Sequence, residues 1–222
     1  MILVPVVRRS RALRAAIAIA LCATFVATPA RAQGTIASTL GPGDTFEPFY
    51  GWLVGVHFRS GLRQDLAMGF TYTGAGPVRL TRLRLAMSEG SDSHAGLLVS
   101  LLRGSSVATA SVLESWTLPS TGGSDGALRV FDSFLEPRLM PGETYWVRAM
   151  HAPATPAAWG WLVGSRTGSD GFWYNQGRGW AFNPPNDSPG YDVQSTGIVP
   201  EPATLVLVAV GLAGVLVVRR HA

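Results

Sequence analysis

This sequence contains only one cysteine and no lysine. Its 222 residues include one cysteine, Cys22, and all 18 of its lysine-plus-arginine residues are arginines. Cys22 lies in an N-terminal apolar segment that we expect to be removed, so the mature chain has neither a thiol nor a disulfide. Lipid attachment at Cys22 is disfavoured because the bulky Leu21 directly precedes it. The stability of the mature protein must therefore come from packing alone.

Residues 1–32 have the three parts of a secretory signal peptide. Four arginines and no acidic residue precede an apolar run at residues 15–26, and an Ala-x-Ala pattern ends at Ala32. The apolar run has about a dozen residues, which is too short for a permanent span of the ~30 Å hydrocarbon layer. We therefore expect export by the Sec machinery and cleavage after Ala32. The twin-arginine route is an alternative that Arg8 and Arg9 suggest, but the residues after them match its signal poorly.

Residues 199–222 form a second appendage. After Val199 they consist of the motif Pro200, Glu201 and Pro202, an uncharged apolar run at 203–218, and a basic end at 219–221. Sixteen helical residues extend about 24 Å, which is short for a membrane span but workable where flanking arginines reach the surface. We therefore expect one transmembrane helix whose terminal arginines stay in the cytoplasm, with the preceding chain on the exported side.

This order of a Pro-Glu-Pro motif, a short hydrophobic helix and a basic pair resembles the PEP-CTERM sorting domain. That tail occurs on exported proteins of Gram-negative bacteria that make exopolysaccharide. The resemblance implies an exosortase, a membrane enzyme with a cysteine nucleophile, as the processing partner. By position, Pro200, Glu201 and Pro202 would be its recognition motif, and Arg219 and Arg220 the stop signal. It also implies passage through the inner membrane to the cell envelope, surface or extracellular matrix. A plain tail anchor is the alternative, but it leaves the prolines unexplained.

The nominal charge of +4 does not indicate nucleic-acid binding. Five arginines lie in the signal peptide and two in the tail, whereas residues 33–198 contain 11 arginines and 13 acidic residues, a net charge of −2. The mature domain has no basic surplus to attract nucleic acid, so we expect no such partner.

Residues 33–198 predict one all-β domain. Short segments rich in β-branched and aromatic residues alternate with Gly, Pro, Ser and Asp clusters, and no long helical stripe occurs. The expected strands are 49–58, 66–73, 78–87, 97–103, 107–118, 128–135, 144–151, 159–163, 171–175 and 179–182. Within 78–87 the buried positions change phase, which predicts a β-bulge near Thr81 and Arg82.

The stretch from Pro141 to Val147 resembles a strand entry in exported modules of the choice-of-anchor type. Residues 69–85 and 97–102 fit the same layout. The resemblance implies a single jelly-roll-like β-sandwich, and it carries no activity that transfers to this chain.

The sequence favours a protein that is not an enzyme. It lacks G-x-S-x-G and H-E-x-x-H motifs, and the mature histidines His57, His94 and His151 have no ligand spacing. Three Gly-Ser-Asp loops, at residues 90–92, 123–125 and 168–170, offer oxygens to a calcium ion as an alternative, but turn chemistry explains the same residues. We therefore expect no catalytic residue, no metal and no cofactor. A secreted hydrolase with paired carboxylates, drawn from residues such as Glu89 and Glu114, is the remaining enzymatic alternative.

Aromatic residues are concentrated between positions 159 and 182. Trp159, Trp161, Trp173, Tyr174 and Trp180 stand there beside amide and guanidinium groups, a combination that suits stacking on sugar rings. The competing interpretation places the alternating Trp159 and Trp161 in the sandwich core. The function favoured by sequence is therefore an exported, non-enzymatic surface or matrix protein, with exopolysaccharide binding as the alternative.

Overall fold

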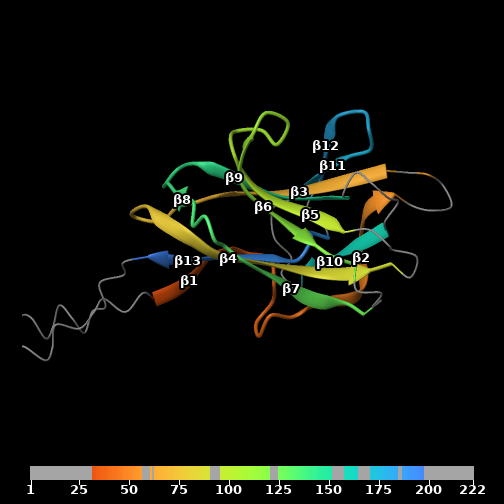
Figure 1. Cartoon of the computed structure of the whole chain (residues 1–222), viewed down its shortest axis with the longest axis horizontal. Coiled ribbons are helices and arrows are strands. Elements are labelled where there is room, and N and C mark those ends of the chain that lie inside the picture. Colours follow the sequence, from red (N-terminus) through yellow and green to blue (C-terminus); the bar gives the residue numbers. More distant parts are fainter. Residues whose placement is uncertain are drawn as a thin grey trace, which may run out of the picture. The chain divides into compact units, whose positions relative to one another are not determined.

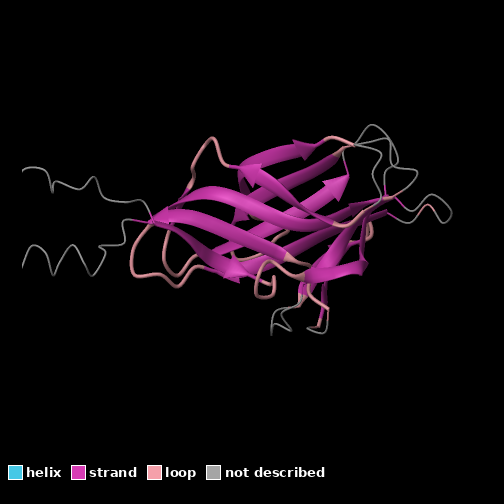
Figure 2. Cartoon of the chain, turned by 90° about the horizontal axis from the view of Figure 1, so that it is seen from below, coloured by secondary structure: helices cyan, strands magenta, loops and turns pink. Residues whose placement is uncertain are grey.

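The computed structural model describes residues 32–56, 61, 63–90, 96–120, 125–151, 158–164, 171–184 and 187–197. This part of the chain consists of strands and loops, and Gln33–Gly197 form one compact unit (Figure 2). The prediction of an all-β fold is confirmed. None of the residues just given forms a helix able to cross a membrane. The predicted signal peptide up to Arg31 and the tail from Ile198 onward lie outside the described residues.

The strands form one open sheet that folds into two layers (Figure 1). The first layer contains β1 (Ala32–Ser38), β13 (Tyr191–Gly197), β4 (Val78–Glu89), β10 (Ala158–Gly164) and β2 (Phe46–Val56), with β7 (Ala127–Asp132) and β8 (Arg138–Leu139) paired to β4. The second layer contains β3 (Arg63–Thr71), β9 (Thr144–His151), β5 (Leu97–Arg103) and β6 (Ser111–Leu118), with β11 (Phe172–Asn175) and β12 (Trp180–Asn183) beside β3. The arrangement agrees with the predicted β-sandwich.

One edge of β3 joins the two layers. Its residues Arg63 and Gln64 pair with β2, whereas its next residues, Asp65 to Ala67, pair with β11. The sheet therefore passes from the first layer to the second along β3. From Asp65 onward, the strand that pairs with this edge of β3 is β11 instead of β2.

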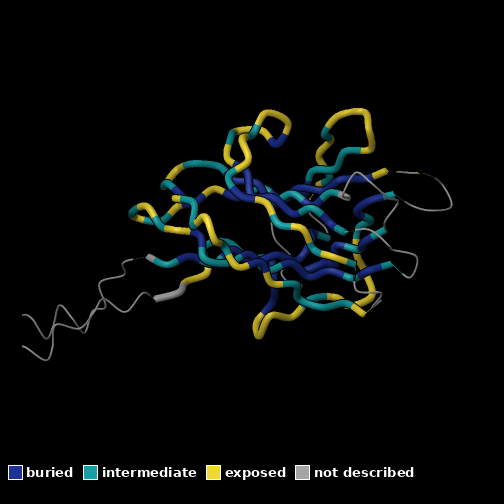
Figure 3. The backbone as a smooth tube through the Cα atoms, in the orientation of Figure 1, coloured by how far each residue is buried: buried dark blue, intermediate teal, exposed yellow. Residues whose placement is uncertain are grey.

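The main core lies between the layers, where most buried segments are found (Figure 3). Trp159 and Trp161 are 1% and 0% exposed and are among its largest members. The indole nitrogen of Trp161 donates a hydrogen bond of 2.9 Å to the Gly190 carbonyl, so burial leaves no polar group of this ring unpaired. The core interpretation of these two tryptophans is confirmed.

The predicted bulge in β4 is also confirmed. Arg82 pairs with Gln194 and Leu80 with Ser195, so Thr81 is an extra residue relative to β13. Leu80 and Leu83 are both fully buried on the two sides of this irregularity. The inserted residue restores the phase of the apolar positions, as expected for a strand with one buried face.

At the edge of the second layer formed by β6, hydrogen bonds connect β6 with the end of β7 and with the segment that follows it. The buried Glu114 carboxylate accepts hydrogen bonds from the Ser133 hydroxyl at 2.5 Å and from the amides of Phe134 and Leu135 at 2.9 and 3.3 Å. Trp116 donates its indole N–H to the Asp132 carbonyl at 3.0 Å. Glu114, a carboxylate considered for hydrolysis from sequence, thus has a structural role.

Candidate functional site

The five aromatic residues singled out by sequence do not share one surface. Trp159 and Trp161 belong to the core, which corrects their assignment to a ligand-facing surface. Tyr174 packs against the main core from the inner side of β11. Trp173 and Trp180 instead join a separate cluster on the outer side of the second layer. The reason is the two-residue period of a strand, which turns Trp173 away from its neighbour Tyr174.

The outer cluster is a small hydrophobic assembly apart from the main core. It is made of Ala67, Leu102, Val107, Trp146, Ala110, Trp173 and Trp180. The loop at residues 104–110 and the β11–β12 hairpin both project from this side of the sheet (Figure 1). The face therefore has two projecting elements, and β9 and β3 contribute Trp146 and Ala67 to the same cluster.

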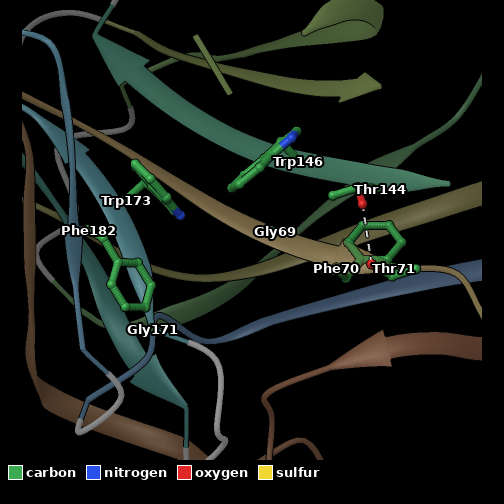
Figure 4. Close-up of a pocket in the computed structure, with 8 residues that line it drawn as sticks. All are labelled: Gly69, Phe70, Thr71, Thr144, Trp146, Gly171, Trp173 and Phe182. Carbon is green, nitrogen blue, oxygen red and sulfur yellow. Dashed lines mark hydrogen bonds between the residues drawn. The ribbon is translucent and has the colours of Figure 1, made fainter. Parts of the chain in front are cut away.

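An aromatic pocket of about 410 Å³ opens on this face. Its lining comprises Gly69, Phe70, Thr71, Thr144, Trp146, Gly171, Trp173 and Phe182 (Figure 4). Trp146 and Trp173 meet edge to face, with ring centroids 6.1 Å apart and an interplanar angle of 88°. Trp173 and Phe182 are 5.6 Å apart. Three rings thus form a continuous aromatic wall.

Two glycines make room for this wall. A Cβ atom added at Gly69 would lie 2.8 Å from Cζ3 of Trp146, so the indole lies directly over the Gly69 backbone. The Phe182 ring lies over Gly171 in the same way. Trp146 is further fixed by a 2.8 Å hydrogen bond from its indole nitrogen to the Gly104 carbonyl. Aromatic rings that cover glycines in this way are held in place by the backbone itself.

Polar groups lie beside the rings. The hydroxyls of Thr71 and Thr144 share a hydrogen bond of 3.3 Å and are exposed. Arg148, paired with Ala67 of the outer cluster, is half-buried on the same face. Burial lowers the pKa of the Arg148 guanidinium from its ordinary value, and the Asp65 carboxylate acts in the opposite direction. The pocket thus combines aromatic faces, hydroxyls and a neighbouring cation.

The lining of the pocket offers faces for stacking and groups for hydrogen bonding. Aromatic rings offer flat apolar faces, and hydroxyls both donate and accept hydrogen bonds, which together match a sugar ring. None of the eight lining residues has a side chain that titrates near neutral pH. Within the described ranges, no group of three or more His, Cys, Asp or Glu side chains is placed to hold a metal ion.

Trp146 and Gly69 are absent from the site residues that the sequence singles out, whereas Phe182 is the last residue of the aromatic segment 159–182. The alternation of bulk in β9 places Trp146 opposite Tyr145 and Val147, and this was the available signal for an outer aromatic residue. The partnership of Trp146 with Gly69 depends on strand register, which pairs β9 with a segment far away in sequence.

Several predicted features lie outside the described residues. These are His57, His94, most of the Gly-Ser-Asp loops, and the sorting residues Pro200, Glu201, Pro202, Arg219 and Arg220. They remain predictions as regards structure.

Comparison with known families bears on the tail directly. The family model for the PEP-CTERM protein-sorting motif matches residues 199–220. The comparison with curated proteins gives no match. The resemblance of the tail to this motif is therefore confirmed, and the motif indicates an exported protein that an exosortase processes at the membrane and sorts to the surface.

Proposed function

We propose that this chain, with its PEP-CTERM protein-sorting motif at residues 199–220, is a non-enzymatic protein of the Gram-negative cell surface or extracellular matrix. The signal peptide directs it to the Sec machinery, and the tail holds it in the inner membrane until an exosortase processes it. The match to the sorting motif is the observation that carries this proposal. A non-enzymatic role is supported by the engagement of Glu89 and Glu114 in hydrogen bonds within the sandwich.

The three parts of the tail solve different physical problems. Arg219 and Arg220 stop translocation, and the apolar run keeps the chain in the bilayer beside the processing enzyme. Each proline fixes its φ near −65° and disfavours helix in the residue before it, so Pro200 and Pro202 present an extended segment. Glu201 lies between these two constraints in the sequence and offers a carboxylate to a cationic group of the exosortase.

Replacing Glu201 by Ala is expected to block maturation without preventing membrane insertion. The apolar run and the arginine pair are unchanged, so the full-length protein accumulates in the membrane fraction. Immunoblotting of fractionated cells measures this. Glu47→Ala, which removes an exposed carboxylate from the folded domain, is the matched control and should mature normally. Processing of Glu201→Ala at the wild-type rate would rule out recognition through this carboxylate.

Exopolysaccharide binding by the aromatic pocket is the second candidate function. The specific observation in its favour is the wall of Trp146, Trp173 and Phe182 beside the hydroxyls of Thr71 and Thr144. Phe182 is 50% exposed, although a side chain of this type is usually buried. An exposed ring held over a glycine is suited to receive the apolar face of a sugar.

Replacing Phe182 by Ala is expected to weaken polysaccharide binding about five- to ten-fold, the size of one lost aromatic contact. Affinity electrophoresis of the full chain, in detergent and with the exopolysaccharide of the source bacterium in the gel, measures the change. Val130→Ala removes an equally exposed apolar side chain from β7, in the other layer, and serves as the control. Equal retardation of the two variants, or no retardation of the wild type, would contradict glycan binding at this pocket.

A further inference from the structure

A second cleft lies on the opposite side of β11 from the aromatic pocket. Its volume is about 230 Å³, and its lining residues are Trp52, Gln64, Phe172, Tyr174, Gln176 and Asn183. They come from β2, β3, β11 and β12 and from the turn that joins β11 to β12. These strands meet where the edge of β3 passes from β2 to β11. We call this cavity the interlayer cleft.

One wall of the interlayer cleft is aromatic and rigid. Trp52 and Phe172 pack with ring centroids 4.7 Å apart, and Tyr174 lies 6.4 Å from Phe172. Trp52 is oriented by a 2.8 Å hydrogen bond from its indole nitrogen to the Asp187 carbonyl. Phe172 is 1% exposed and belongs to the main core. Phe172 therefore supports Trp52 and Tyr174 from the core, and these two half-buried rings are the aromatic groups that a ligand in the cleft can reach.

The opposing groups are amides. Gln176 donates from Nε2 to Oε1 of Gln64 at 2.9 Å, and Gln64 donates from its own Nε2 to the Leu53 carbonyl at 3.1 Å. These bonds fix the direction of both amides. Within the part of the chain that the structure describes, the side-chain amide of Asn183, the Tyr174 hydroxyl and Gln176 Oε1 have no hydrogen-bond partner. The cleft thus holds donors and acceptors ready for a ligand.

We propose that the interlayer cleft binds one neutral pyranose unit of a glycan. A pyranose stacks its C–H face on an aromatic wall and pairs its hydroxyls with amides, whereas an apolar ligand would leave those amides unsatisfied at a cost. The six lining residues are all uncharged, so nothing in the lining neutralises a uronate or a sulfate. The inference goes beyond the proposed function, because the cleft shares no residue with the aromatic pocket.

The test is a titration monitored by saturation-transfer NMR. The full chain, in a detergent without a sugar headgroup, is titrated with methyl glucoside, methyl galactoside and methyl mannoside in turn. At least one glycoside is expected to bind with a dissociation constant of about 1 mM, as a ligand of this size allows. Tyr174→Phe, which removes only the hydroxyl, should weaken this binding about five-fold. Gln176→Ala should act similarly, and methyl glucuronide should bind at least five-fold more weakly than the preferred neutral glycoside.

Phe182→Ala separates this proposal from glycan binding at the aromatic pocket. It should leave glycoside affinity unchanged while polysaccharide retardation falls. Binding of no neutral glycoside to the folded protein, or wild-type affinity in both Tyr174→Phe and Gln176→Ala, would overturn the proposal whatever the result for the polysaccharide. Unaltered near-ultraviolet circular dichroism verifies that each variant is folded.

Discussion

Replacing Trp161 by Ala is expected to lower the free energy of unfolding by about 3–5 kcal/mol, the usual cost of truncating a buried tryptophan. Trp161 is fully buried on β10, and its indole hydrogen bond to the Gly190 carbonyl is lost in the variant. The domain has no disulfide to compensate for the cavity, because its sequence contains no cysteine after Cys22. Chemical denaturation followed by circular dichroism measures the change.

Phe49→Ala is the matched control for Trp161→Ala. Phe49 is an aromatic residue of the neighbouring strand β2, but it is 98% exposed, so its loss should change stability by no more than about 0.5 kcal/mol. A destabilisation below about 1 kcal/mol in Trp161→Ala would show that this residue is not a core residue.

Replacing Arg84 by Met is the second large expected effect, also about 3–5 kcal/mol. The Arg84 guanidinium binds Asp192 at 2.9 Å and forms a two-bond contact with Asp44, so it ties β13 and the loop after β1 to β4. Burial acts to lower the pKa of Arg84, but the hydrogen bonds and charges of Asp44 and Asp192 outweigh it and raise this pKa. Asp192 is only 1% exposed, so the variant leaves a buried carboxylate without its cation.

Two further variants separate this cause from a general loss of packing. Arg84→Met combined with Asp192→Asn removes both charges and should recover a large part of the lost stability, because the orphaned charge is the main cost. Arg82→Met removes a cation from an exposed pair with Asp132 and should cost no more than about 1 kcal/mol. If the double variant is less stable than Arg84→Met alone, the buried charge is not the cause.

Strands with strong apolar patterns were predictable from the sequence. The expected segments 97–103 and 144–151 coincide with β5 and β9, and the phase change in β4 correctly located the bulge. Both β5 and β9 lie inside the second layer between other strands, so local pattern and tertiary packing agree there.

Strands whose burial depends on distant partners were missed. β13 reads as polar, yet it lies between β1 and β4, with Asp192 neutralised by Arg84 and Ser195 also buried. Conversely, Val107 was expected to begin a strand, but it lies before β6, in a loop that packs onto the outer cluster. The aromatic pocket was missed for the same reason, since it depends on which strand lies beside Gly69.

The sorting motif of the tail was predicted from sequence alone and is confirmed by the family model at residues 199–220, because a motif of this kind is a linear order of residues that requires no fold. The domain is the opposite case, since its aromatic residues acquire different roles only after alternate faces of β11 are assigned. Trp173 and Tyr174 are adjacent in sequence, yet they line different cavities.

Mass spectrometry of the C-terminus tests the central claim of export and tail processing most directly. Protein from wild-type cells of the source bacterium should end upstream of Ala222, and protein from cells that lack the exosortase should retain Ala222. Recovery of the intact end at Ala222 in every fraction of wild-type cells would contradict the account and leave residues 199–222 as an ordinary membrane anchor.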